Sequence, residues 1–458
     1  MATTAVLNTY KIFSPPSIKP TSWRLSPNDW LLAPVHLIRC IFFYDIQHWS
    51  GVDKQKFMNV ERLMTSLTKL LDYYPIVAGV FKWHNEDNTV TVEAGGYVSF
   101  VSAEANIPLS NLPLSIDEYT NTDSLPTTLH LINLFNYSDP FSEPILQIQH
   151  TRFTCGSVSL GVHLHHLIVD SHSYFQLVQD WARLYKDVDY QPSVCHERSL
   201  LEPTLEEIDA LRPNISRQKA HCIREPAPVV MTDSVSCISK IFRFSARELE
   251  RMKDAATSQF SDSFFVSTFE VLTAHLHHHV AFARRLDKCE TTRTKLHIAT
   301  NLRPRLQNPP LPATFFGNAA MYTYLELDTE EVLQKNCLAE LSRQIHNAIV
   351  SNTSDELKSY LAWVAAQPDK AKIVPTFELD RGDFAVTAWN KMGMYSMTDF
   401  ECGVHPLRIT FPQGTSFLGA AILFSTEEID SPSIDVILGL PEEQMELLEN
   451  NPDFRKYQ

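Results

Sequence analysis

The sequence predicts a mixed α/β protein made of two similar halves. Segments with the two-residue alternation of strands and segments with helical spacing follow one another irregularly along the chain. The length of 458 residues suits two or three domains, or one fold built from two halves. Prolines and scattered charges break this rhythm at about 190–235, which we interpret as a long crossover. We therefore expect an N-terminal domain (1–190), a linker (191–235) and a C-terminal domain (236–458).

In the first half, residues 60–75 have the apolar spacing of a helix, with Leu63, Leu67, Leu70 and Leu71 on one face. This helix should end at Pro75. Alternating patterns predict strands at 89–94, 144–153 and 158–166. In the last of these strands, the apolar residues should face one way and Ser159, Gly161, His163 and His165 the other. An apolar stripe predicts the next helix at 173–187.

The second half begins with a predicted strand at 238–244. Ser245 and Glu248 then have the spacing of a helix-capping box. A long helix is expected at about 265–286 and a final helix at 441–450. Further strands are predicted at 295–300, 317–327, 384–389 and 415–424.

Composition excludes some classes of partner. The formal net charge of −15 disfavours nucleic acids and anionic membranes, because both are bound through Lys and Arg. A phosphate-bearing small molecule needs only a local basic pocket. The eight cysteines contain no C-x-x-C pair, and neither a signal peptide nor a membrane span is apparent. We expect the cysteines to be reduced and the protein to act as a monomer in the cytoplasm.

The most informative segment is HLHHLIVDS, residues 163–171. His166 stands where a strand ends, a position that fixes the backbone and leaves the ring accessible. Because histidine titrates near neutral pH, His166 can accept a proton from a hydroxyl group. Asp170 can orient a ring or pair with an arginine. A metal site built from these histidines and Asp170 is disfavoured, since the related H-x-H-x-D-H pattern needs Asp where Leu167 stands.

A second histidine-rich segment, HLHHH at 275–279, falls on the long predicted helix. His275 and His279 should share one helix face, which we expect to be partly exposed. Other catalytic patterns are missing, including G-x-S-x-G, the P-loop and G-x-G-x-x-G. With only 13 glycines in the chain, a glycine-rich nucleotide cradle is not expected.

Several motifs occur together in a familiar order, and the chain resembles the BAHD acyltransferases of plants and fungi, including the branch of the trichothecene acetyltransferases. His165-His166-x-x-x-Asp170 resembles the family signature HHxxxDG, with Ser171 in place of Gly. The other matching segments are LTKLLDYYPIVAG (67–79), STFEVLTAH (267–275), NLRPR (301–305), PPLP (309–312), FGN (316–318) and DFECG (399–403), the last in place of DFGWG.

The resemblance implies two mixed-sheet domains like those of chloramphenicol acetyltransferase, with the active site in a channel between them. It makes His166 the general base and pairs Asp170 with an arginine of NLRPR, for which we favour Arg303 over Arg305. Thr387 and Trp389 should line the active site, where either could donate a hydrogen bond to a developing oxyanion. Asp399, Phe400 and Gly403 should form a structural motif far from the chemistry.

The implied function is transfer of an acyl group from acyl-CoA, the co-substrate, to a small-molecule acceptor. We expect acetyl transfer to a hydroxyl or amine of a specialised metabolite, without a covalent acyl-enzyme, a metal or a tightly bound cofactor. Two alternatives remain. A condensation-type enzyme would take its acyl group from a carrier protein, and a non-catalytic relative would only bind ligands.

Overall fold

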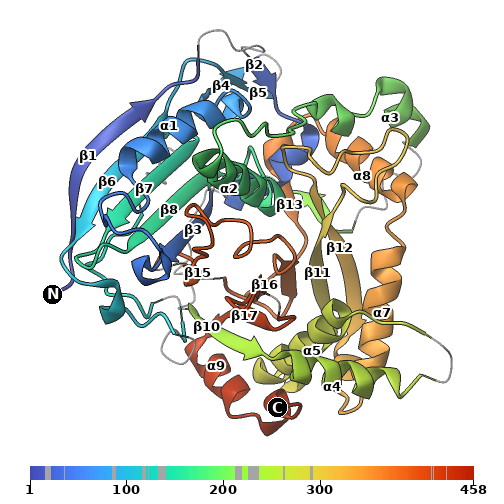
Figure 1. Ribbon diagram of the computed structural model, residues 1–458. Helices are drawn as coiled ribbons and strands as arrows, with labels where there is room; N and C mark the ends of the chain where they lie inside the picture. The colour runs from blue at the N-terminus through green and yellow to red at the C-terminus, as the bar shows by residue number, and fades with distance from the viewer. Residues whose placement is uncertain are drawn as a thin grey trace.

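A computed structural model describes the chain except for residues 16–21, 36, 85–88, 116–119, 122, 133–140, 212–218, 225–236, 261–263, 289–291, 414, 416 and 430. Over the described residues, two large six-stranded sheets lie side by side and helices cover them (Figure 1). This is the two-sheet α/β fold that the sequence predicts. Much of the predicted crossover at 191–235 falls outside the described residues.

The first sheet is mixed. Its strand order is β1 (Thr4–Ile12), β6 (Val98–Ala105), β7 (Leu146–Arg152), β8 (Val158–His165), β3 (Leu37–Tyr44) and β15 (Arg408–Thr410). Strand β15 comes from the second half of the sequence and pairs antiparallel with β3. Helices α1 (Val60–Leu70) and α2 (Ser171–Lys186) pack against this sheet and each other.

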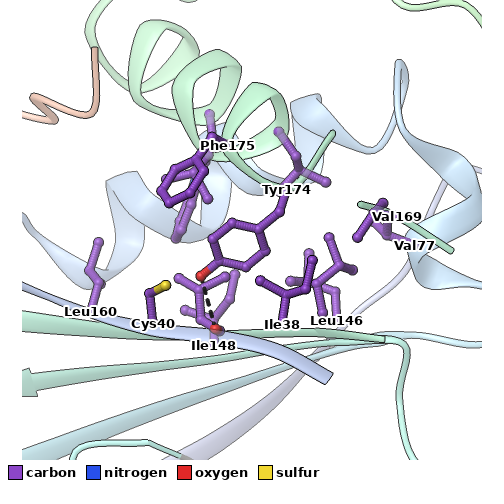
Figure 2. Close-up of a cluster of buried hydrophobic side chains, with 14 of the residues drawn as sticks. Ile38, Cys40, Val77, Leu146, Ile148, Leu160, Val169, Tyr174 and Phe175 are labelled. Atoms are coloured by element: carbon purple, nitrogen blue, oxygen red, sulfur yellow. Dashed lines mark hydrogen bonds between the residues drawn. The ribbon is translucent and has the colours of Figure 1, made fainter. Parts of the chain in front are cut away.

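The apolar core of this half lies between the sheet and helix α2 (Figure 2). Tyr174 points from α2 toward the sheet, where its hydroxyl donates to the backbone oxygen of Val162 at 3.1 Å. The helix begins earlier than the sequence predicts, because Asp170 caps it by accepting from the backbone N–H of Ser173. The signature aspartate therefore also determines where α2 starts.

Strand β8 is buried along both faces. The prediction placed its apolar residues on one side, and these do join the main core. The opposite face is covered as well, and a Cβ atom at Gly161 would lie 2.4 Å from the backbone oxygen of Leu131. The glycine at position 161 therefore leaves the space in which the chain at Leu131 crosses this face of the strand.

The second sheet has the order β10 (Cys237–Phe244), β17 (Ile434–Pro441), β16 (Ala420–Ser425), β14 (Phe384–Ala388), β11 (Arg293–Asn301) and β12 (Ala320–Asp328). The predicted capping box of Ser245 and Glu248 opens helix α4 as expected. The helices of this half are α4 (Ala246–Thr257), α5 (Thr268–Ala283), α6 (Thr329–Leu333), α7 (Leu338–Val350), α8 (Ser354–Ala366) and α9 (Glu442–Glu449).

Smaller elements complete the fold. A three-stranded sheet contains β2 (Ser22–Arg24), β5 (Thr89–Glu93) and β4 (Val80–His84). Within the 191–235 segment, the structure describes helix α3 (Leu205–Leu211) and strand β9 (His221–Ile223). Strand β9 pairs with β13 (Ile373–Pro375), so the crossover is attached to the second half of the molecule.

Three of the four histidines of α5 are buried, contrary to the partly exposed face expected for His275 and His279 from the sequence. His275, His277 and His279 are 3%, 1% and 1% exposed. His275 and His279 do share a face, with ring centroids 4.4 Å apart. The His275 ring also bonds the backbone oxygen of Phe454 at 2.9 Å. The segment that follows α9 covers these rings, and nothing in the local pattern 275–279 indicates that distant contact.

Candidate active site

His166 is the first residue after strand β8, and its ring lines a cavity of about 690 Å³. Residues of both large sheets contribute to the cavity wall, including Leu37 and Ile38 of β3 and Ala385 and Ala420 of β14 and β16. The wall also contains Asp170, Arg303, Thr387 and Trp389. The structure therefore places these predicted site residues around one cavity.

His166 is partly exposed, and the protein covers one of its two ring nitrogens. Its Nδ1 atom is buried without a hydrogen bond of good geometry. Burial lowers the pKa of His166, and the smaller effects of its own backbone oxygen, the Asp170 charge, the Asn318 side chain and the Val169 backbone oppose this. A lowered pKa keeps the ring neutral at pH 7, the form that can accept a proton.

The Asp170 carboxylate is engaged by the protein. It lies 2.7 Å and 3.1 Å from the Arg303 guanidinium nitrogens, and it accepts from the backbone N–H groups of Ser173 and Ala319. Burial alone would raise the pKa of Asp170, but the Arg303 charge and these hydrogen bonds outweigh it and lower the pKa. Asp170 is thus ionised and held in place by Arg303.

Arg303 also connects other parts of the fold. It donates to the backbone oxygens of Phe315 and Gly317 and to the Ser173 hydroxyl. The neighbouring Arg305 instead donates to the backbone oxygen of Ile349 on α7. Of the two arginines considered from the sequence, Arg303 is the one that contacts Asp170.

Thr387 and Trp389 stand at the end of β14, on the cavity wall. The Trp389 indole N–H donates to the Thr387 hydroxyl oxygen at 3.2 Å. The Trp389 ring stacks on Phe424, with 5.3 Å between ring centroids. Because the indole N–H already has a partner, the Thr387 hydroxyl is the better placed donor for a ligand in the cavity.

The segment in place of DFGWG packs around helix α2. Asp399 forms an ion pair with Lys186 at 2.6 Å. Phe400 is fully buried, with its ring against Tyr44 and Trp181. Gly403 has φ +75°, a left-handed conformation that favours glycine. None of the three is among the described residues that line the cavity.

A second buried ion pair holds the loop after β8, and sequence reasoning missed it. Asp29 is fully buried and lies 3.2 Å from Arg198, which comes from the crossover. Arg198 also donates to the backbone oxygen of Ile168 at 2.9 Å. Asn318 bonds Asp29 and donates to the backbone oxygen of His166 at 2.7 Å. The His166 loop is therefore held by this network as well as by Arg303.

Gly317 lets this network form. A Cβ atom there would lie 2.4 Å from an Arg198 guanidinium nitrogen and 2.7 Å from the Phe315 ring. In the FGN segment, Gly317 thus lets the Arg198 side chain come close to the backbone, and the Asn318 side-chain amide bonds Asp29 and the His166 backbone. The motif itself was visible in the sequence, but its buried partners lie far away along the chain.

Across the described part of the chain, no group of three His, Cys, Asp or Glu side chains is arranged to hold a metal ion. His165 Nδ1 accepts from the backbone N–H of Leu167, which occupies one potential ligand atom. No helix among the described residues is long and apolar enough to cross a membrane.

The paired sheets, the shared cavity and the histidine at a strand end are the arrangement expected from the motifs for an acyltransferase of the two-domain type. A family model described as "Transferase family" matches residues 4–455. The chain belongs to this family, the BAHD acyl-CoA-dependent acyltransferases.

Similar proteins agree with this assignment. A hydroxycinnamoyltransferase of Narcissus pseudonarcissus is 27% identical and aligns over 82% of this chain and 83% of its own length. A hydroxycinnamoyl-CoA:5-hydroxyanthranilate N-hydroxycinnamoyltransferase of Avena sativa is 28% identical, with 85% of each chain covered.

Two solved structures show the same fold. Vinorine synthase is similar with a TM-score of 0.69 and 21% identity, covering 97% of this chain and 96% of its own. TRI101 of F. graminearum, crystallised with coenzyme A and T-2 mycotoxin, gives a TM-score of 0.75 at 17% identity. That match covers 96% of this chain and 99% of TRI101.

Proposed function

We propose that this enzyme transfers an acyl group from acyl-CoA to a hydroxyl or amine group, with His166 as the general base. The observation that carries the proposal is the His166 ring, which lines a cavity reached by residues of both sheets while its Nδ1 atom is buried. Burial of Nδ1 leaves Nε2 as the ring nitrogen for a substrate. A neutral ring in that position can accept a proton from the acceptor.

The reaction needs no covalent acyl-enzyme. His166 Nε2 takes the proton of the acceptor hydroxyl while that oxygen forms a bond to the thioester carbonyl carbon. The resulting tetrahedral oxyanion collapses, the carbon–sulfur bond breaks, and the CoA thiolate takes the proton from His166. Acceptor and thioester must meet within one cavity, and this alignment supplies much of the rate.

Thr387 is the proposed oxyanion donor. Its hydroxyl oxygen accepts from the Trp389 N–H, which leaves the hydroxyl hydrogen free to point at a substrate oxygen. A donor that is already oriented costs little reorganisation during the reaction. Trp389 then acts as a positioning residue for Thr387.

We propose structural roles for the remaining predicted residues. Asp170 and Arg303 hold the His166 loop, because their charged groups already bind each other and neighbouring backbone atoms. Asp399, Phe400 and Gly403 support the C-terminal part of α2. We also propose that the enzyme works as a cytoplasmic monomer, with CoA thioester as co-substrate and no tightly bound cofactor.

The acyl group and acceptor are proposed at the level of a class. Resemblance to the trichothecene branch favours acetyl transfer to an alcohol of a specialised metabolite. The names of similar plant enzymes instead describe hydroxycinnamoyl groups, and anthranilates among the acceptors. The cavity of about 690 Å³ has the size of a small-molecule site and is compatible with both.

The test is a panel of acyl-CoAs, from acetyl to 4-hydroxycinnamoyl, offered with alcohols and aromatic amines. Acyl product mass and CoA release are both measured. His166→Ala should abolish transfer, whereas His172→Ala, which removes another cavity-lining histidine, should retain it. Turnover by His166→Ala near the parent rate would exclude the proposed base. Transfer only from a carrier-protein thioester would favour the condensation-type alternative.

A further inference from the structure

The proposed mechanism requires one of the two neutral forms of the His166 ring. A neutral imidazole carries its proton either on Nδ1 or on Nε2, and the hydrogen bond made by one nitrogen decides the form of the other. Nε2 can accept a proton from a substrate only while Nδ1 carries the ring proton. The Nδ1 atom is buried. An acceptor inside the protein must therefore hold this proton in place.

The Asn318 side chain lies beside that nitrogen. Its Nδ2 atom donates to the backbone oxygen of His166 at 2.7 Å. Burial lowers the pKa of His166, whereas its own backbone oxygen, the Asn318 side chain and the Val169 backbone raise it, as acceptors for a ring N–H do. A histidine reaches its own backbone oxygen with Nδ1 and not with the more distant Nε2. The Asn318 amide, which bonds this same backbone oxygen, is therefore on the Nδ1 side of the ring.

Asp29 determines which way the Asn318 amide points. The Asp29 carboxylate accepts from Nδ2 of Asn318 at 3.0 Å and from the Asn318 backbone N–H at 3.2 Å. It also accepts from the Arg198 guanidinium at 3.2 Å and from the backbone N–H and hydroxyl of Ser26. Because every described partner of this carboxylate is a donor, the amide atom turned toward it is the nitrogen. The amide oxygen must then lie on the other side.

That oxygen and the ring nitrogen are both buried and lack another partner. Oδ1 of Asn318 and Nδ1 of His166 each have no hydrogen bond of good geometry among the described residues. A buried polar atom without a partner is costly, and a hydrogen bond from Nδ1–H to Oδ1 satisfies both atoms at once. The carboxamide would then hold one residue at two points, with Nδ2 on its backbone oxygen and Oδ1 on its ring.

We propose that Asn318 is a positioning residue for His166, and that Asp29 orients its amide so that Oδ1 accepts the Nδ1 proton. Nε2 then keeps its lone pair for the substrate. This role rests on the acyl transfer proposed above and concerns the same site. When His166 takes up the substrate proton, the ring becomes positive and its bond to Oδ1 strengthens, because hydrogen bonds from charged donors are stronger. Asp170, although it belongs to the signature, binds Arg303 and backbone N–H groups instead.

The first experiment measures the position of the ring proton in the parent enzyme. Nitrogen NMR of protein labelled in its histidine rings distinguishes protonated from unprotonated nitrogens, and the His166→Ala spectrum identifies the signals of His166. At a pH where the ring is neutral, Nδ1 should carry the proton. A proton on Nε2 in the parent would overturn the inference without any change at Asn318.

The second experiment removes the acceptor. Asn318→Leu keeps a similar side-chain shape without Oδ1, so the ring proton should divide between the two nitrogens and kcat should fall by about tenfold to a hundredfold. The KM for acyl-CoA should change little, since Asn318 is not among the described residues that line the cavity. Loss of an acceptor lowers the pKa of His166 further, so the acid limb of kcat/KM should move to lower pH.

Asn28→Ala is the matched structural control. The buried Asn28 side chain donates to the backbone oxygens of Asn318 and Ala320 at 2.8 Å and 3.0 Å. Its loss should lower the melting temperature but leave the ring proton on Nδ1 and the acid limb in place. Asp29→Asn should lower kcat per folded molecule, and in the Asn318→Leu background it should lower kcat no further, because Asp29 acts through Asn318.

The outcomes separate this inference from the proposed function. If Asn318→Leu folds and keeps both the Nδ1 proton and the parent kcat, backbone oxygens hold the proton and the inference fails. If Asn28→Ala moves the acid limb as far as Asn318→Leu, a loosened loop and not Oδ1 is responsible. Should Asn318→Leu not fold, Asn318→Ala takes its place with the same expected results. Each of these failures leaves His166 as the base, whereas full activity of His166→Ala would overturn the mechanism itself.

Discussion

The two histidine-rich segments of this chain look alike in sequence and differ in what the fold does with them. HLHH at 163–166 ends a strand, and its last ring lines the cavity. HLHHH at 275–279 lies inside α5, and three of its rings are buried by the packing of the second half. The first segment presents a ring to substrates, and the second fills a core. Access to a cavity, and not the number of histidines, distinguishes the two.

The largest expected effect sharpens this comparison. His166→Ala should lower kcat by at least about 10²–10⁴-fold, the usual contribution of a general base, with little change in melting temperature. His275→Ala should lower the melting temperature with little change in kcat, because it removes the hydrogen bond to the Phe454 backbone and leaves a cavity in the core. Rates per folded molecule and thermal unfolding give both numbers. A similar loss of activity in both variants would break the distinction.

The two arginines of NLRPR should also differ in their effect on stability. Arg303→Met leaves the Asp170 carboxylate buried without its cation and should cost about 3–5 kcal/mol of unfolding free energy. Arg305→Met is the matched control, since the Arg305 side chain makes one described hydrogen bond, to the backbone oxygen of Ile349, and its loss should cost about 1 kcal/mol. Urea unfolding measures both. Equal losses would show that the Asp170 pair has no special part in holding the His166 loop.

Acid should destabilise the protein through its buried histidines, which include those of the second segment and His163 of the first. Burial lowers the pKa of His275 and of His277 to about 3, below the ordinary value of 6.5. Between these values the unfolded chain binds more protons, so stability falls as the pH drops from about 6.5 toward 3. Each histidine contributes a slope of up to about 1.4 kcal/mol per pH unit. Urea unfolding at several pH values should show a flatter dependence in His277→Leu; an unchanged slope would contradict this origin.

The smallest effect concerns the pH dependence of the reaction. Because burial lowers the pKa of His166, its ring stays neutral below pH 6.5. The acid limb of kcat/KM should therefore fall at a lower pH than for a free imidazole. Rates must be normalised to the folded fraction, because protonation of the α5 histidines also favours unfolding as the pH falls. An acid limb at or above pH 6.5 would contradict the environment described for His166.

Local patterns predicted those features that depend on local spacing. The capping box at Ser245 and the strand that leads to His166 follow from neighbouring residues, and the structure confirms both. Family motifs also indicated the two sheets. The prediction that the His275 face is partly exposed was wrong, because the segment that buries it, around Phe454, lies far away in sequence. A helix pattern shows which residues share a face, but not what covers that face.

In the candidate site, too, residues that are close in sequence were predicted and residues that meet only in the fold were not. His166 and Asp170 are close in sequence, so a pattern could indicate them. Asp29 and Arg198 are separated by most of the first half, and no periodicity relates them. The cavity-lining residue His221 was not predicted for a different reason, since it lies on β9, in the segment interpreted as a linker. Residues brought to a cavity by irregular chain are recognised only from their contacts.

Strand β15 gives the molecule a particular order of assembly. It is made late in synthesis, yet it lies at the edge of the first sheet and pairs with β3 (Figure 1). Residues Ile41, Phe42 and Phe43 of β3 are buried in the finished fold. Until residues near 410 leave the ribosome, β3 has an open edge that can pair with another chain. Nascent and truncated forms of the first half should therefore depend on chaperones, and the two halves cannot be exchanged as independent modules.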